Sequence, residues 1–192
     1  MSEHDRARAM AASVVRTARS CGVPAEGIEV ISRAHAGAME PRVAALADDH
    51  HPAYLHPGRS VLILLRDVGP LPSHLLAAAS VHETEDAALR VDIGWVRSAL
   101  GERIGELVAS LPSPGSEDLL ERLVTLDPGA CLVALAERLD HLRHAHLRDA
   151  PAWWRTIHEE AGDVWLPVAE RAHPRLGTRF RHWHRAFARR VV

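Results

Sequence analysis

The sequence predicts an all-α protein, folded as a compact helical bundle. Apolar residues recur at helical spacing along most of the chain, whereas few stretches alternate between apolar and polar residues as strands do. Hydrophobic residues make up 47% of the 192 positions and charged residues 25%, which is the composition of a globular chain. No repeat or linker divides the sequence, so we expect one domain over residues 1–192.

The expected helices of the N-terminal half are separated by glycine, proline and polar residues. They cover about residues 5–20, 26–38 and 58–66, followed by a fourth helix that begins near Pro72. Gly22 and Pro24 are expected to end the first helix. Ser73 is a suitable N-terminal cap for the fourth helix, which would carry His82 at its C-terminal end.

In the C-terminal half, residues 91–111 predict one long amphipathic helix, because their apolar side chains fall on one side. Those side chains are Ile93, Val96, Leu100, Ile104, Leu107 and Val108. Ser116 is expected to cap the next helix. Residues 128–147 are the most apolar helical segment and should run through the middle of the domain. Further helices are expected over about residues 152–161, 164–172 and from 175 onward.

Charge and cysteine content indicate which classes of binding partner and which cellular compartment to expect. The formal net charge is −2 and all 23 basic residues are arginine, so the balance indicates neither nucleic acid nor an anionic membrane. Residues 151–192 carry eight arginines and four carboxylates. Within them we expect the stretch from Arg175 to Arg190 to be a solvated helix face, with phosphate binding or partner docking as the alternative. Cys21 and Cys131 lack metal-binding spacing and are expected to be reduced thiols. The N-terminus lacks a signal-peptide pattern and no apolar run is long enough to cross a bilayer, which predicts a cytoplasmic protein.

A polar group, His-Glu-Thr-Glu-Asp at residues 82–86, directly follows an apolar helical stretch. Imidazole and carboxylate donors suit a divalent metal ion, but several rigid segments must supply them. His56, at the entrance to the third helix, and Glu137, inside the apolar segment, are the candidate partners. A carboxylate at position 137 is costly to bury unless a metal ion or Arg138 compensates its charge. The sequence therefore predicts a metal site.

Five fragments occur in order along the chain. They are RAHAG at 33–37, PAYLHP at 52–57, LAAASVHETED at 76–86, LAERLDHLR at 135–143 and VWLPVAERAHPRLG at 164–177. Together they resemble the HD superfamily of metal-dependent phosphohydrolases, and within it the Rel/Spo-type alarmone hydrolase domain and the small alarmone hydrolases. That family typically shows Ala-His-x-Gly, Pro-Tyr-Ile-x-His-Pro, Ala-Ala-x-Leu-His-Asp-x-x-Glu-Asp, Leu-Ala-Asp-Arg-Leu-His-Asn and Tyr-x-Pro-Leu-Ala-x-Arg-Leu-Gly at these places. The resemblance covers roughly residues 30–180 and implies a helical bundle of the HD-domain type.

By this resemblance, the metal ligands would be His56, His82, Glu83 and Glu137. The family has aspartate at the last two positions, and glutamate keeps the oxygen donor while adding one methylene. Asp140, one helical turn beyond Glu137, is a reserve ligand. The implied cofactor is one divalent metal ion, with Mn²⁺ as the first choice and Fe, Co, Ni or Zn as alternatives.

The resemblance also implies metal-assisted hydrolysis of a nucleotide, such as guanosine 3'-pyrophosphate, or of a related phosphorylated small molecule. Glu85 and Asp86 correspond to the family's acidic pair, which assists proton transfer, although the spacing is one residue shorter here. Arg42, His141 and Trp165 would contact the substrate, the tryptophan by stacking on a base.

Other interpretations stay open. His56 could simply open a helix, and Glu137 could form an ion pair without any metal. His144 and His146 allow a second metal site, and we expect the Trp153–Trp154 pair to be packing residues. The rival functional class is a catalytically silent HD relative that binds a nucleotide or a protein partner in a regulatory role. The sequence leaves the oligomeric state open.

Overall fold

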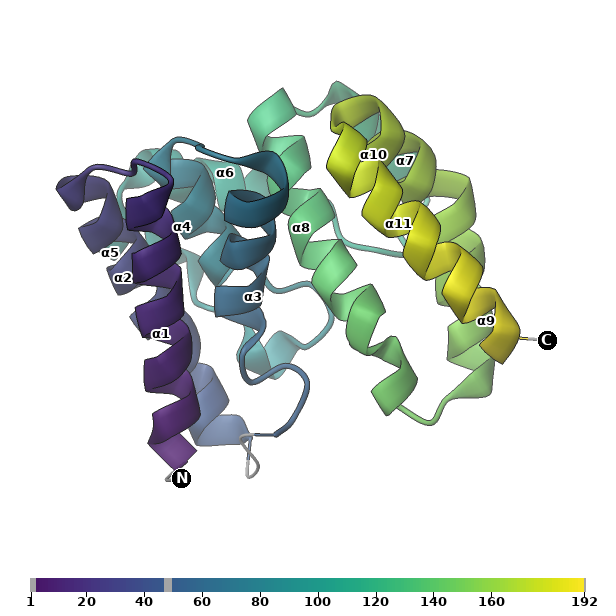
Figure 1. The fold of residues 1–192 in the computed structure, drawn as a ribbon, viewed down its shortest axis with the longest axis horizontal. Coiled ribbons are helices and arrows are strands. Elements are labelled where there is room, and N and C mark those ends of the chain that lie inside the picture. The colour runs from purple at the N-terminus through teal and green to yellow at the C-terminus, as the bar shows by residue number, and fades with distance from the viewer. Residues whose placement is uncertain (1–2, 47–49, 192) are drawn as a thin grey trace.

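The chain is almost entirely helical in the part that the structure describes, residues 3–46 and 50–191 of a computed structural model (Figure 1). The α-helices are α1 (Glu3–Ser20), α2 (Ala25–Ala45), α3 (His56–Ile63), α4 (Ser73–Val81), α5 (Ile93–Leu100), α6 (Glu102–Ser110), α7 (Leu119–Thr125), α8 (Pro128–His144), α9 (Pro151–Glu160), α10 (Leu166–Ala172) and α11 (Pro174–Phe187). Leu64–Val68 and Ala161–Trp165 form π-helical turns, and Ala87–Leu89, Ala145–Leu147 and Ala188–Arg190 form 3-10 turns. No strand occurs within the described residues, which confirms the prediction of an all-α bundle.

Helix α8 lies at the centre of the fold, as its apolar sequence predicts. It packs against α3 and α4 on one side and against α10 and α11 on the other (Figure 1). Asp127 starts the helix, because its carboxylate accepts hydrogen bonds from the first free backbone N–H groups. Eleven of the 17 residues in α8 are buried, including the charged residues Glu137, Arg138 and Asp140. Buried charges of this kind are tolerated only where other groups compensate them.

Residues 91–111 form two helices, so the prediction of one long amphipathic helix is wrong. The chain turns at Gly101, whose φ of 99° lies in the left-handed region that favours glycine. Helices α5 and α6 on either side of the turn pack against each other. Val96 and Ile104 are buried, but Ile93 is 36% exposed. The apolar spacing continues across the break, which is why periodicity alone does not reveal it.

Several helix ends also differ from the predicted bounds. Helix α2 continues past Pro41 to Ala45, and α3 begins at His56 rather than near residue 58. Asp118 precedes α7, while the hydroxyl of Ser116 donates to the Ser113 carbonyl, so the predicted Ser116 cap is not formed. The expected break between the helices on either side of residues 161–164 is instead a π-helical turn, which makes α9 and α10 continuous.

Three segments meet where α3, α4 and α8 pack together. The first residue of α3 is His56, the residue directly after α4 is His82, and α8 contributes Glu137 and His141. Residues 82–86 leave α4 as an irregular segment before the next 3-10 turn. The fold therefore brings side chains from three separate helices to one place.

The cysteines and the helix lengths bear on the predicted thiol state and on membrane insertion. Cys21 and Cys131 are both free thiols, as expected. Within the described residues, no helix combines the length and the apolar character that crossing a membrane requires.

Candidate metal centre

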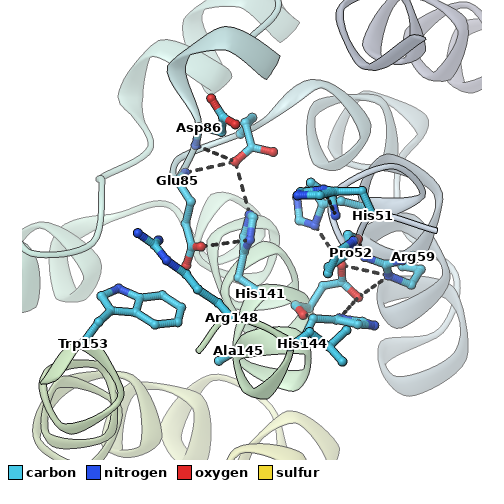
Figure 2. Close-up of a pocket in the computed structure, with 15 residues that line it drawn as sticks. His51, Pro52, Arg59, Glu85, Asp86, His141, His144, Ala145, Arg148 and Trp153 are labelled. Atoms are coloured by element: carbon cyan, nitrogen blue, oxygen red, sulfur yellow. Dashed lines mark hydrogen bonds and ion pairs between the residues drawn. The ribbon is translucent and has the colours of Figure 1, made fainter. Parts of the chain in front are cut away.

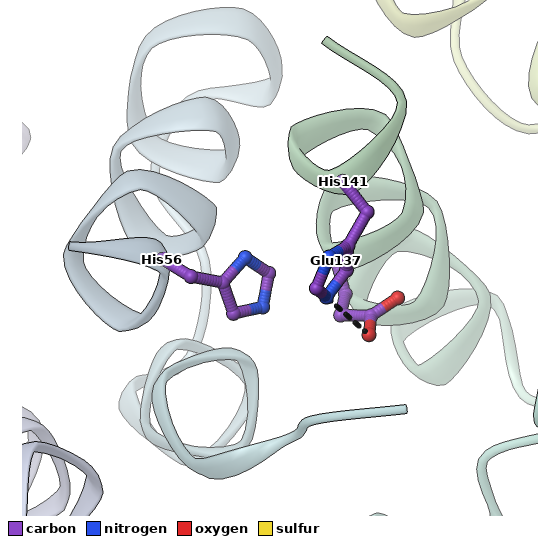
Figure 3. Close-up of side chains that lie close together, drawn as sticks. All are labelled: His56, Glu137 and His141. Carbon is purple, nitrogen blue, oxygen red and sulfur yellow. Dashed lines mark ion pairs between the residues drawn. The ribbon is translucent and has the colours of Figure 1, made fainter. Parts of the chain in front are cut away.

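The side chains of His56, Glu137 and His141 converge between α3 and α8 (Figure 3). One donor atom from each residue lies within 4.8 Å of the donor atoms of the other two. This is close to the spacing of ligands that each lie about 2.0–2.2 Å from one shared ion. Glu137 and His141 are one helical turn apart, so they project from the same face of α8.

Asp140 orients the imidazole of His56. Nδ1 of His56 donates to Oδ2 of Asp140 at 2.8 Å, and Nε of Arg59 donates to Oδ1 of the same carboxylate at 2.8 Å. Burial alone would raise the pKa of Asp140, but His56 and Arg59 lower it, so the carboxylate is ionised. A carboxylate that holds one ring nitrogen leaves the other nitrogen available to a metal ion. Asp140, the reserve ligand that the sequence suggested, therefore contacts His56 and Arg59 and is not one of the three converging donors.

Glu137 is buried, and its charge is compensated without Arg138. Its Oε1 accepts hydrogen bonds from the backbone N–H of Thr84, at 3.1 Å, and from the Thr84 hydroxyl. Burial alone would raise the pKa of Glu137, but His141 and the other nearby imidazoles hold it well below the usual range. Arg138 instead donates to Glu85 at 2.8 Å and to Glu160 at 3.0 Å. The alternative of a Glu137–Arg138 ion pair is therefore wrong.

His141 lies among three carboxylates. Its Nε2 is 3.2 Å from Oε1 of Glu137 and 3.3 Å from Oε1 of Glu83, and its Nδ1 is 3.4 Å from Oε2 of Glu85. Burial alone would lower the pKa of His141, but these carboxylates, Glu137 first, raise it well above its usual value. Nε2 makes no well-directed hydrogen bond with either neighbour. The imidazole therefore stands in a position that attracts positive charge.

Glu83 and His82 border this cluster without belonging to the three closest donors. Oε2 of Glu83 accepts from Nη2 of Arg42 at 2.6 Å, and its Oε1 accepts from the backbone N–H groups of Glu85 and Asp86. Burial alone would raise the pKa of Glu83, but the nearby imidazoles, His141 first, lower it to about 2. His82 is also buried, its pKa is lowered by that burial, and its Nε2 has no hydrogen-bond partner.

A cavity of about 540 Å³ opens beside the cluster (Figure 2). Its lining includes His56, His141 and both residues of the predicted acidic pair, Glu85 and Asp86. Arg138 holds Glu85, as described above, whereas the carboxylate of Asp86 caps the following 3-10 turn by accepting from the backbone N–H of Ala88 at 2.9 Å. Glu85 is therefore the member of the pair that contacts the candidate metal centre.

Two predicted substrate-binding residues are buried away from this cavity. Arg42 is 1% exposed and donates to the carbonyls of Ala38, Ala53 and Leu89 as well as to Glu83. Trp165 is also 1% exposed, and its Nε1 donates to Glu160 at 2.7 Å. Neither side chain lines the cavity. Arginine and tryptophan have long apolar parts that pack well in a core, so the sequence alone does not separate the two roles.

The residues present fit a divalent metal ion. The cluster combines imidazole nitrogens with a carboxylate oxygen, a donor set that suits Mn, Fe, Co, Ni or Zn. Four buried imidazole nitrogens among the described residues have no hydrogen-bond partner, and two of them, Nε2 of His82 and Nε2 of His141, lie at this site. Buried polar atoms are rarely left in that state without a reason.

His141 is the cluster member that was not among the metal ligands predicted from the sequence. It was expected to contact substrate, because it stands where the resembled family has asparagine. Its spacing of four residues from Glu137 was the available signal, since such pairs share a helix face. His144, by contrast, uses Nδ1 to contact the Asp140 carbonyl at 2.7 Å. In the described part of the chain, no metal-like cluster includes His144 or His146.

Comparisons with known protein families and with curated proteins found no match to this chain.

Proposed function

We propose that this protein is a metal-dependent phosphohydrolase of the HD type, acting on a nucleotide or a related phosphorylated small molecule. One observation carries the proposal: the donor atoms of His56, Glu137 and His141 lie within 4.8 Å of one another. Two of these residues line a cavity of about 540 Å³, a size typical of small-molecule sites. The five sequence fragments that resemble the HD superfamily support the same reading.

In this proposal, the three converging residues hold one divalent ion, with the imidazole of His82 close by. Asp140 keeps His56 in the orientation that binding requires. When bound, the ion supplies a Lewis acid that polarises a phosphoryl oxygen and makes a nearby water molecule more acidic. Mn²⁺ is the first ion to test.

Glu85 is the proposed proton acceptor. It lines the cavity, and its Oε2 lies 3.4 Å from Nδ1 of His141 while Arg138 fixes the other oxygen. A carboxylate held in this way beside the reacting group can take the proton of an attacking water. Asp86, which caps a 3-10 turn, is assigned no step.

The proposal is tested by metal analysis and by phosphate release. Protein purified without chelators is analysed for bound metal, and then incubated with Mn²⁺ and a panel of nucleoside monophosphates together with guanosine 3'-pyrophosphate. We expect bound metal and phosphate or pyrophosphate release, both lost in Glu137→Gln and retained in Glu121→Gln, which changes an exposed carboxylate on α7.

Two outcomes would overturn this function. The first is a protein that binds no divalent metal and releases no phosphate from any compound in the panel. The second is a folded Glu137→Gln variant that is as active as the wild type. Nucleotide binding by a metal-free, inactive protein would favour the regulatory alternative.

A further inference from the structure

Arg148 and Trp153 form a flat, cationic wall at one side of the cavity. The guanidinium carbon of Arg148 lies 4.9 Å from the centre of the Trp153 ring, a cation–π arrangement. Trp154 fixes the intervening segment, because its Nε1 donates to the carbonyls of Ala145 and Arg148 at 3.1 and 2.8 Å. Trp154 thus packs as expected, whereas Trp153 also lines the cavity. Figure 2 shows Trp153 and Arg148 on the opposite side of the cavity from His51 and Arg59.

Arg148 has no compensating carboxylate among the residues that the structure describes. Two other arginines near the site are neutralised, Arg59 by Asp140 and Arg138 by two glutamates. Among the described residues, no carboxylate lies within ion-pair distance of Arg148. An unpaired guanidinium on a cavity wall attracts an anion, and phosphate groups are well suited to its geometry.

The wall also borders a second cavity. This second cavity, of about 270 Å³, lies beside α9, and its lining includes Gly115 and Thr156. Glu85, Arg148 and Trp153 line both cavities. The indole and guanidinium therefore border both the cavity beside the candidate metal centre and the second cavity. This arrangement fits a ligand that has a phosphoryl group at one end and a flat aromatic group at the other.

We propose that Trp153 and Arg148 form a nucleobase-binding subsite, which makes a nucleotide the substrate class. This inference rests on the proposed function for the position of the phosphoryl group. The base lies against the indole and guanidinium, since every nucleobase has a π-face that stacks on such groups. The phosphoryl group extends toward His56 and His141. The stacking itself is tolerant of base identity, so both purine and pyrimidine nucleotides are expected to bind.

Equilibrium binding, without turnover, tests this subsite. The probes are guanosine 5'-monophosphate and ribose 5-phosphate, which has the phosphate but no base, titrated calorimetrically into the full chain. We expect Trp153→Ala to weaken the nucleotide by about tenfold or more and to leave ribose 5-phosphate unchanged. Trp153→Phe keeps a flat ring and should restore most of the nucleotide affinity.

Arg148→Gln provides the second test, matched by Arg143→Gln, which changes an exposed arginine near the end of α8 outside both cavities. The first variant should weaken the nucleotide by about tenfold, and the second should not. Should Trp153→Ala fail to fold, Trp153→Phe and Arg148→Gln still decide the question.

Three results would overturn the subsite: equal affinity for the nucleotide and for ribose 5-phosphate, unchanged nucleotide affinity in both Trp153→Ala and Arg148→Gln, or no nucleotide binding at all. The proposed hydrolase function fails separately, through absent metal or absent phosphate release from any phosphorylated compound. A phosphohydrolase that acts on base-free phosphates, for example, would keep the function and reject the subsite.

Discussion

His56 donates a hydrogen bond from Nδ1 to Oδ2 of Asp140 at 2.8 Å, although the two residues are 84 positions apart in the chain. The bond joins the first turn of α3 to a buried residue in the C-terminal part of α8. It fixes the imidazole so that Nδ1 carries the proton and Nε2 is the remaining donor nitrogen. The metal-binding capacity of His56 should therefore depend on Asp140.

Asp140→Asn is expected to lower the affinity for Mn²⁺ by about 10- to 100-fold, because the neutral amide holds the imidazole less firmly. Calorimetric titration of the metal-free protein measures this. Asp149→Asn, which changes an exposed carboxylate nearby, should retain the wild-type affinity. Equal affinity in the two variants would show that the His56–Asp140 bond does not support metal binding.

Mn²⁺ should stabilise the folded wild-type protein against unfolding, by about 2.7 kcal/mol when its concentration is a hundred times the dissociation constant. His141→Ala should show little of this gain, because it removes one of the three converging donors. Denaturant unfolding with and without Mn²⁺ gives the comparison, and His146→Ala, outside the cluster, serves as the control. A full Mn²⁺ gain in His141→Ala would remove His141 from the ligand set.

Arg42 and Glu83 form a buried ion pair, with both side chains 1% exposed. Arg42→Met should reduce the free energy of unfolding by about 3–5 kcal/mol, since it leaves Glu83 buried without its cation. Adding Glu83→Leu to the same protein should recover part of that loss. Urea unfolding of the single and double variants measures both effects. Arg16→Met, at an exposed position of α1, should be nearly neutral.

His35 makes the fold sensitive to acid. Burial, with a smaller effect of Arg42, lowers the pKa of His35 from 6.5 to about 4 in the folded protein. The unfolded chain therefore binds a proton at a higher pH than the folded chain does. The stabilising contribution is complete above about pH 6.5 and is lost as the pH falls toward 4, a change of about 3 kcal/mol. His35→Leu should show a flatter dependence of unfolding free energy on pH over this range, and an unchanged slope would contradict the assignment.

Gly37, in the fragment RAHAG, is required by packing. A Cβ at this position would lie 2.0 Å from Cη2 of Trp95, so α2 and the start of α5 approach closely there. Gly37→Ala should lower the free energy of unfolding by about 1–3 kcal/mol, which thermal or urea unfolding can measure. Combining it with Trp95→Leu should reduce the additional cost of the alanine. If the alanine costs the same in both backgrounds, the clash with the indole is not its cause.

Structural features that depend on a repeated sequence pattern could be predicted from the sequence. Features that depend on one residue or one contact could not. Apolar periodicity predicted the all-α fold and the central position of α8, because a buried helix needs apolar side chains at many positions along its length. It missed the break at Gly101, since one residue with a positive φ turned the chain without disturbing the apolar spacing.

The candidate site shows the same contrast. The positions of His56 and Glu137 could be predicted from the ordered fragments, and the structure brings them together. The contacts of Asp140 and Arg42 could not be predicted, because each residue pairs with a partner more than 40 positions away in the chain. Whether a charged side chain faces a cavity or a buried counter-ion is settled by tertiary packing alone.

On helix α8, the side chains of Glu137 and His141 point toward His56. The side chain of Arg138 points toward Glu160 on α9. The neighbours of α8 on opposite sides are the N-terminal helices α3 and α4 and the C-terminal helices α10 and α11. The donors of the candidate metal centre lie on α3 and α8, so they can adopt their mutual arrangement only after α3 has docked on this helix. Acquisition of metal by the nascent or refolding chain would therefore follow this long-range docking, and would report that α3 and α8 have come together.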